Sequence, residues 1–403
     1  MSAGENEVSV AALKCPQCGA GLPGAGGHLV CQYCGSSLVV TGREVPRHAG
    51  EAEKPDVGGE AEVRRGMRLE PYLLPDPEGS GLDVLRMLVP VGWTKGGEVR
   101  WDLRSMRMPA TITCRVANPS GLEVFEILPT MSFAVSSPMG GWMGAGQSFG
   151  AEIRQPTDAQ TALRDLVIPR YRGDRAGLNI VRIVQAQELA EAVAAETAVP
   201  VGAHHCDGAR ARIAYQSEGQ QLEEEIFGVV EVWQLPSAAM FGAMDVFWYV
   251  SHIVVCRAAE GKLDDLAGLY EILIRSIKVN PQWMGVYEQV IGMLAQGQIH
   301  HVQQIAQLGS MYAQTGTGFG LQDQPSWFGR QQVWGGSGEE GGEWIGAVQS
   351  YRDPYQGLVM ELPSQYSHAW ASRNGEVIVT DDPDFDPNKD VDSGGEWARM
   401  QAR

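Results

Sequence analysis

The stretch FWYVSHIVVCRAAEGKLDDLAGLYEILIRSIKV, residues 247–279, decides the fold class. Its first part, 247–258, is almost continuously apolar and rich in β-branched and aromatic residues, which is typical of a buried strand. From residue 262 the apolar residues recur every three or four positions, at 263, 266, 269, 270, 273, 274 and 277. That spacing predicts an amphipathic helix. A helix that follows a buried strand and has one apolar face predicts a helical layer packed on a sheet.

Shorter strands and helices precede this stretch. Residues 110–118 and 122–128 alternate apolar and polar side chains around the turn Asn118-Pro119-Ser120-Gly121, which predicts an antiparallel hairpin. The other expected elements are strands at 82–90, 178–186 and on both sides of Ser217-Glu218-Gly219 within 210–235, and helices at 157–168 and 187–196. The helix at 157–168 is expected to begin at Thr157 and to stop before Pro169. This order predicts an α+β fold, an antiparallel sheet with helices packed on it.

The central region also resembles a known family. The segment VPVGW (89–93), the paired strands in the middle and the late strand and helix of 251–279 resemble the PsbP-like α/β/α sandwich domains over residues 69–280. That resemblance implies a domain that acts mainly by binding other proteins. The loop 131–150 departs from a compact version of that fold.

The amino-terminal part carries four cysteines with metal-ligand spacing. Cys15 and Cys18 form one CxxC pair and Cys31 and Cys34 form another, and a glycine follows each pair. Two such pairs supply four thiolates in a tetrahedral arrangement, which suits a closed, structural Zn²⁺ site. The pattern resembles the zinc ribbons found at the ends of many proteins.

Iron in a rubredoxin-like site uses the same four ligands, so the choice between zinc and iron stays open, and a redox role for the pairs is disfavoured. The other three cysteines, Cys114, Cys206 and Cys256, are scattered singly. This number and spacing do not predict a disulfide framework, and they favour a reducing, cytoplasmic environment.

The net charge and the hydropathy of the chain limit the classes of partner that we expect. The net charge of −18 repels phosphate backbones, so nucleic acid is an unfavourable partner, and the ribbon itself has no basic patch. No run of 18 apolar residues predicts a membrane span, and no secretory signal is visible in the first residues. We therefore expect a cytoplasmic protein with a protein partner.

Composition predicts six segments along the chain. They are a zinc ribbon at 10–42, a flexible linker at 43–67, the central α+β domain at 68–280, a long helix at 281–314, a Gly-rich linker at 315–343 and a Trp-rich β module with an acidic tail at 344–403. Asn280 and Pro281 are expected to cap the long helix, and Asn374-Gly375 predicts a hairpin turn in the last module.

Histidines offer the main catalytic or metal-binding candidates outside the ribbon. His204-His205-Cys206-Asp207 places four potential ligands in succession, but adjacent residues rarely reach one ion, so we interpret this segment as a polar loop before a strand. His300 and His301 lie on the predicted long helix about 100° apart and cannot share a metal. His252 lies in the apolar strand and is expected to be a core residue with its polar atoms satisfied.

Two further patterns have structural interpretations. Gly146-Gln147-Ser148-Phe149-Gly150 fits GxSxG, but it lacks the preceding strand and following helix of a nucleophile elbow. Glu223, Glu224 and Glu225 could form an acid/base pair, and we interpret them instead as a solvated strand edge.

The acidic tail raises the possibility of calcium. Asp384, Asp386, Asn388 and Asp390 alternate like oxygen ligands in a Ca²⁺ loop. Lys389 stands where an EF-hand needs glycine, and Gly395 stands where it needs the bidentate glutamate. We therefore favour a solvated acidic tail over a calcium site.

The sequence supports two functional hypotheses. The first is a zinc-ribbon protein that binds or scaffolds other proteins without evident catalytic activity, with a contact surface on the loop 131–150 formed by Met131, Phe133, Met139, Trp142, Met143 and Phe149. The alternative is a hydrolase or transferase with a site between the central domain and the C-terminal module, where His204, His205, His252 and the Asp-rich stretch would converge. No P-loop, dinucleotide-binding fingerprint or HExxH motif is present.

Overall fold

The structure is a computed structural model of the 403-residue chain, and its contacts divide the chain into two compact units, Met1–Glu62 and Val63–Arg403. It describes residues 27–30, 37–40, 66–135, 147–148, 151–196, 202–236, 244–314, 348–389 and 395–402. In the first unit, β1 (Gly27–Val30) pairs antiparallel with β2 (Ser37–Val40). The expected metal ligands lie outside the described residues, so the zinc ribbon stays a prediction; these are Cys15, Cys18, Cys31 and Cys34.

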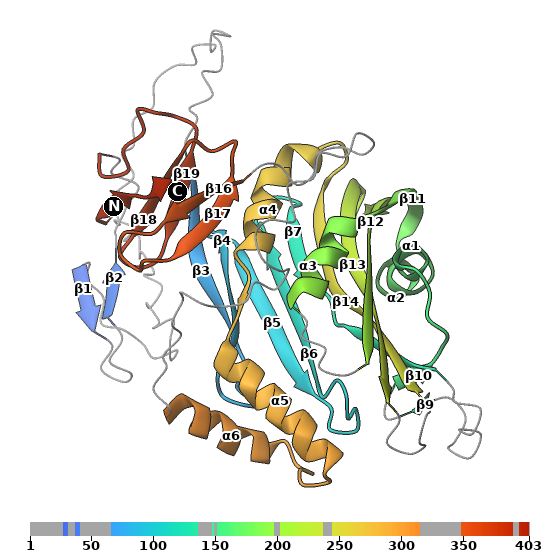
Figure 1. The fold of residues 1–403 in the computed structure, drawn as a ribbon. Helices are drawn as coiled ribbons and strands as arrows, with labels where there is room; N and C mark the ends of the chain where they lie inside the picture. The colour runs from blue at the N-terminus through green and yellow to red at the C-terminus, as the bar shows by residue number, and fades with distance from the viewer. Residues whose placement is uncertain are drawn as a thin grey trace, which may run out of the picture. The chain divides into compact units, whose positions relative to one another are not determined.

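The largest sheet of the second unit runs in the order β11-β12-β13-β14-β7-β6-β5 (Figure 1). These strands are β5 (Thr94–Trp101), β6 (Ala110–Ala117), β7 (Val124–Ile127), β11 (Ala176–Gln185), β12 (Ala203–Ser217), β13 (Gln220–Pro236) and β14 (Met244–Ala259). The strand β8 (Met131–Ala134) also pairs with β14, and β10 (Ala151–Ile153) joins β8 to β9 (Gln147–Ser148). The hairpin between β12 and β13 turns at Glu218 and Gly219, which both have positive φ, and confirms the turn predicted there.

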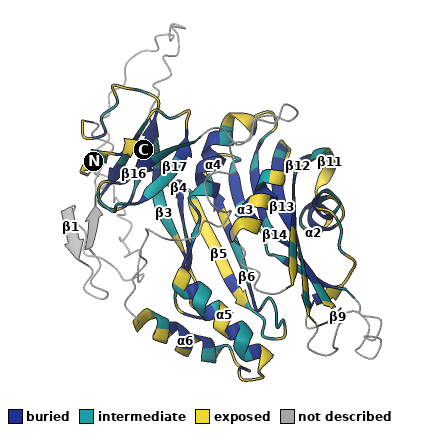
Figure 2. Ribbon diagram, viewed as in Figure 1, coloured by how far each residue is buried: buried dark blue, intermediate teal, exposed yellow. Residues whose placement is uncertain are grey.

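Helices cover both faces of this sheet, because its central strands carry apolar residues on both sides. On one face the helical segment α1 (Ala159–Ala162), η2 (Leu163–Val167) and α2 (Ile168–Arg172) packs on β12–β14. On the other face lie α3 (Gln187–Glu196) and α4 (Ala267–Arg275), preceded by the short turn η3 (Asp264–Leu266). The middle strands β13 and β14 are therefore buried, whereas the edge strand β5 is largely exposed (Figure 2).

A second sheet joins the two ends of the described part of this unit. Its order is β15 (Lys278–Val279), β4 (Asp83–Pro90), β3 (Met67–Pro75), β19 (Val377–Thr380), β18 (His368–Ser372) and β20 (Trp397–Arg399). A third sheet contains β17 (Val359–Pro363), β16 (Val348–Arg352) and β21 (Gln401–Ala402). Because β19 pairs with β3, with Val377 opposite Leu69, the C-terminal strands share a sheet with the central region. This differs from the expected separate β module.

Two predicted helices differ in extent. The first begins with Asp158, whose side chain accepts from the Thr161 amide, and it continues through Pro169 to Arg172. A π-helical turn at 163–167 precedes the proline and shifts the backbone hydrogen bonds, so the missing amide of Pro169 does not end the helix. The predicted long helix is divided into α5 (Pro281–Ala295), capped by Asn280 as expected, and α6 (Gln303–Gln314).

The mixed sheets and packed helices agree with the predicted α+β class. Within the part of the chain that the structure describes, no helix combines the length and apolar character needed to cross a membrane.

Candidate metal centre

His204 and Cys206 lie on the same face of β12, because alternate residues of a strand point the same way. The segment expected to be a loop is part of that strand. Its register on β13 places His204 opposite Trp233 and Cys206 opposite Glu231. The interpretation of residues 204–207 as a loop is therefore wrong. Because alternate residues of a strand share a face, the side chains of His204 and Cys206 can approach one point, which adjacent residues could not do.

Three donor atoms meet at this place. His204 Nε2 lies 3.2 Å from Glu231 Oε2 and 3.4 Å from Cys206 Sγ. All three donor atoms lie within 4.8 Å of one another, and this is the one such group of acids, histidines and cysteines among the described residues. The His204 side chain is only 4% exposed and its ring packs against Trp233 with centroids 4.1 Å apart. The donors therefore converge in a largely dry environment.

A β-bulge in β14 brings a second histidine to the same carboxylate. Between the pairs Phe227–Val254 and Val229–Ser251, β14 has one residue more than β13, and His252 in this bulge has φ +52°. The Ser251 hydroxyl donates to Glu231 Oε1, and His252 Nδ1 lies 2.8 Å from Ser251 Oγ and 3.8 Å from Glu231 Oε1. A left-handed backbone costs a non-glycine residue about 1 kcal/mol or more, and such strain is concentrated at functional sites.

The bulge also determines which residues of β14 reach the centre. Val254 and Cys256 face α3 and α4, and an unbroken strand would place residues 250 and 252 on that face. The extra residue shifts the alternation, so Val250 packs in the opposite core and Ser251 reaches Glu231 instead. His252 is thus neither in a regular strand nor fully buried, which corrects its expected place in the core.

The protonation states follow from burial and neighbouring charges. Burial alone would raise the pKa of Glu231, but the hydrogen bond from His204, the charge on His252 and the hydrogen bond from Ser251 together hold it below its ordinary value. Burial, with the nearby Glu231 carboxylate, raises the pKa of the Cys206 thiol to about 12. Burial and the neighbouring groups therefore favour an ionised carboxylate beside a protonated thiol.

The other predicted ligands do not join this centre. His205 is exposed on the opposite face of β12, and Asp207 accepts from the Ala159 amide at 2.7 Å at the start of α1. The backbone amides of His300 and His301 both donate to Gln304 Oε1 before α6 begins. Of the histidines expected to converge, the structure brings His204 and His252 together.

The predicted calcium ligands have other partners in the described residues. The Asn388 amide group donates to the Trp397 carbonyl and accepts from the Trp397 amide, while Asp386 pairs with Lys389 at 3.3 Å. Asp384 donates its own backbone amide to Asp382. Asp390 lies outside the described residues, so calcium binding remains a prediction without support from this geometry.

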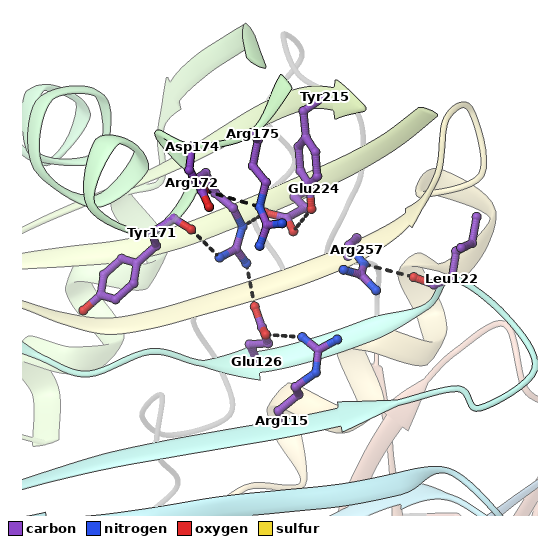
Figure 3. A network of polar contacts seen from close by, with 10 residues as sticks. All are labelled: Arg115, Leu122, Glu126, Tyr171, Arg172, Asp174, Arg175, Tyr215, Glu224 and Arg257. Carbon is purple, nitrogen blue, oxygen red and sulfur yellow. Dashed lines mark hydrogen bonds and ion pairs between the residues drawn. The ribbon is translucent and has the colours of Figure 1, made fainter. Parts of the chain in front are cut away.

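Two of the three residues of the acidic run on β13 are buried, so the interpretation of the run as a solvated edge is wrong. β13 lies between β12 and β14, and Glu224 and Glu225 are 1% and 0% exposed. Glu224 accepts from Arg172 Nε at 2.5 Å and from the Tyr215 hydroxyl at 2.6 Å, and Arg172 continues to Glu126 (Figure 3). Cations from neighbouring elements compensate the buried charge, so these carboxylates are engaged in structure.

The structure describes only part of the GxSxG segment and part of the predicted contact surface on the loop 131–150. Gln147 and Ser148 form the strand β9, and the remainder of the GxSxG segment lies outside the described residues. In the predicted contact surface, Met131 and Phe133 belong to the core, where Phe133 stacks on Trp248 with centroids 4.2 Å apart. Met139, Trp142, Met143 and Phe149 lie outside the described residues.

Glu231 is the site residue that sequence reasoning missed. It is a single carboxylate within the apolar run IFGVVEVWQL, residues 226–235. An isolated charge in a buried strand requires a partner, and this was the available signal. The identity of its partners depends on strand pairing, which the sequence pattern did not provide.

No protein-family model, no curated protein and no solved structure matches this chain.

Proposed function

We propose that this protein binds a transition-metal ion through His204, Cys206 and Glu231. The observation that carries this proposal is the convergence of three different donor atoms on one point. Ligands of a tetrahedral Zn²⁺ ion are about 3.3–3.6 Å apart, as follows from its bond lengths to nitrogen, oxygen and sulfur. The separations of 3.2 and 3.4 Å from His204 Nε2 match this spacing. The mixed nitrogen, sulfur and oxygen set favours Zn²⁺.

A nucleophilic Cys–His–Glu triad fits the same residues less well. In a triad the base contacts the nucleophile with one ring nitrogen and the orienting carboxylate with the other. Here His204 Nε2 is the nitrogen nearest to both groups, and Nδ1 is 4.0 Å from Cys206 Sγ. The raised pKa of Cys206 also opposes a free thiolate nucleophile.

Three protein ligands leave one coordination position for water or a substrate, which is the arrangement of catalytic zinc sites. A bound Zn²⁺ ion supplies Lewis acidity and lowers the pKa of a coordinated water. This favours hydrolysis, the alternative raised by the sequence, although the centre lies within the large sheet and uses no residue of the described C-terminal strands. In the hydrolysis of an acyl substrate, the oxygen of water would bond to the acyl carbon and His252, in its neutral form, would accept the proton. That proton passes to the leaving group as its bond to the acyl carbon breaks.

Metal content tests the proposal in the full-length chain. After dialysis against zinc and then metal-free buffer, we expect a second zinc equivalent beyond that of the predicted ribbon. The variants His204→Ala and Cys206→Ser should each lose this equivalent. His205→Ala, on the same strand but facing away, should retain it.

Folding is checked by circular dichroism for each variant. As an independent measurement, Co²⁺ added to a chain with the four ribbon cysteines replaced by serine should give visible bands with thiolate character. The proposal is wrong if that chain binds no Co²⁺, or if Cys206→Ser leaves the spectrum unchanged.

We also propose, from the sequence, that Cys15, Cys18, Cys31 and Cys34 hold a structural zinc ion and that the ribbon contacts another protein. The pairing of β1 with β2 supports this, because Cys31 and Cys34 then belong to the connection between two antiparallel strands. Pulldown with the intact chain and with the four-serine variant tests the role in protein binding. Equal recovery of every partner by both chains would contradict it.

A further inference from the structure

Arg107 lies on the connection between β5 and β6, close to the face that carries the metal centre. The connection is closed by the Asp102 amide, which donates to the Pro109 carbonyl at 2.7 Å. The Arg107 guanidinium carbon lies 3.5 Å from the centroid of the Phe247 ring. The next residue, Met108, contacts the Tyr287 hydroxyl through its sulfur at 3.8 Å. The connection is therefore held against both β14 and α5.

The strand register relates Arg107 to the proposed metal. Phe247 lies opposite Trp233 and Tyr249 lies opposite Glu231, and all four side chains belong to the face of the sheet that carries His204. Phe247 is thus a diagonal neighbour of Glu231, at a separation of about 7–8 Å. The guanidinium over Phe247 therefore lies on the part of the sheet next to the strand positions that carry the centre.

The charge on Arg107 has no acidic counterpart among the described residues: no carboxylate there lies within ion-pair distance of it. In a chain of net charge −18, an arginine stacked on an aromatic ring without an acid partner offers its N–H groups to a ligand. The Tyr249 side chain is close enough to both Arg107 and Glu231 for their charges to affect its pKa. Burial raises its pKa to about 12, Arg107 opposes this and Glu231 adds to it, so the hydroxyl keeps its proton at neutral pH and can donate.

We infer that the centre accepts small ligands with two acidic groups, one reaching the metal and the other pairing with Arg107. A short dicarboxylate, or an ester or amide derived from one, carries the two acidic or acyl groups that such a site would bind. This inference rests on the metal centre proposed above, and it adds the substrate class.

The test uses glutarate and butyrate, which differ in the second carboxylate. Each is titrated into the Co²⁺-loaded full-length chain with serine at the four ribbon positions, and the visible spectrum is followed. We expect glutarate to bind at least about tenfold more tightly than butyrate, since a hydrogen-bonded ion pair contributes a factor of this order. Arg107→Met, which can keep the packing on Phe247, should abolish the preference without changing butyrate binding.

Arg104→Met is the matched control, because Arg104 lies in the same connection but is exposed and pairs with Asp102 at 2.8 Å. It should retain the preference for glutarate. Calorimetric titration of glutarate into the zinc-loaded unaltered chain repeats the measurement without the serine substitutions.

The outcomes separate the two proposals. If no Co²⁺ binds, the metal centre itself is wrong and the inference falls with it. If Co²⁺ binds but glutarate and butyrate have equal affinity, or if Arg107→Met keeps the preference, the metal centre stands and the assignment of Arg107 is overturned.

Discussion

At the scale of single residues, the carboxylates of β13 show how a buried charge is accommodated. Glu225 is fully buried, and Arg212, Arg182 and Arg210 approach it at 2.7, 3.7 and 3.9 Å. Glu224 and Glu126 share Arg172 in the same way (Figure 3). These three carboxylates are compensated by cations from neighbouring strands or helices, because an uncompensated buried charge there would cost several kcal/mol.

Glu225→Gln should therefore destabilise the protein by about 3 kcal/mol, since it removes the charge that its arginines surround. Urea unfolding followed by circular dichroism measures this change. Glu223→Gln, on the same strand but partly exposed, should change the free energy of unfolding by less than about 0.5 kcal/mol. Equal unfolding midpoints for the two variants would contradict the assigned role of Glu225.

The pKa of Glu126 predicts how stability depends on pH. Burial raises it, but Arg172 and Arg115 together hold it below its ordinary value of 4.5. A lowered pKa in the folded state contributes stability that is present above the unfolded value and is lost as the pH falls through the folded value. The urea midpoint should thus decrease as the pH falls below about 4.5, and Glu126→Gln should show a smaller decrease over this range. Identical pH profiles for the two proteins would rule this contribution out.

At the scale of elements, the end of α5 shows how a short signal divides a long helical pattern. The Gln298 amide donates to the Met293 carbonyl at 2.8 Å and the Gly297 amide donates to the Leu294 carbonyl at 3.0 Å. These are the bonds of a Schellman motif, and Gly297 has φ +66° as that motif requires. The apolar periodicity continues beyond it, so periodicity alone predicted one helix over 281–314.

Gly297→Ala should destabilise the protein by about 1 kcal/mol, because alanine is strained at positive φ. A methyl group there would meet no atom within 4 Å, so backbone strain is the whole effect. Gly292→Ala, inside α5 and also without close neighbours, should instead stabilise by up to about 1 kcal/mol. Thermal unfolding measures both, and a stabilising Gly297→Ala would contradict the helix end described here.

At the scale of the whole molecule, the second sheet is completed by segments far apart in the sequence. Leu69 on β3 is fully buried against the core that contains Val377, Ala371 and Leu362 from the C-terminal strands. The third sheet packs on the same core. Residues near both ends of the described part of the second unit therefore form one cooperative structure.

Ending the chain after residue 343 should consequently lower the thermal unfolding temperature and promote aggregation, because it exposes the edge of β3 and the core residues beneath it. Removing residues 1–62 should leave the transition of the remainder unchanged, since that segment forms a separate compact unit. Differential scanning calorimetry with light scattering compares the two. An unchanged transition after the C-terminal truncation would contradict the shared core.

Much of the local structure of this protein follows from patterns in its amino-acid sequence. The buried strand at 247–258, the turn at Glu218-Gly219 and the cap at Asn280 are found where the pattern predicts them. The helix after the strand is also present, but α4 extends only over Ala267–Arg275, and Lys278–Val279 form the strand β15. These features depend on side-chain periodicity and on the conformational preferences of a few neighbouring residues. Both properties can be read from the sequence alone.

The neighbours of each strand, and therefore the residues of the candidate site, follow from packing in three dimensions. His204 and Cys206 meet Glu231 because of one particular register between β12 and β13, and Ser251 joins them because β14 contains a bulge. The burial of Glu225 and the pairing of β19 with β3 have the same origin. Register and strand order are set by the packing of residues distant in sequence, and no local pattern encodes them.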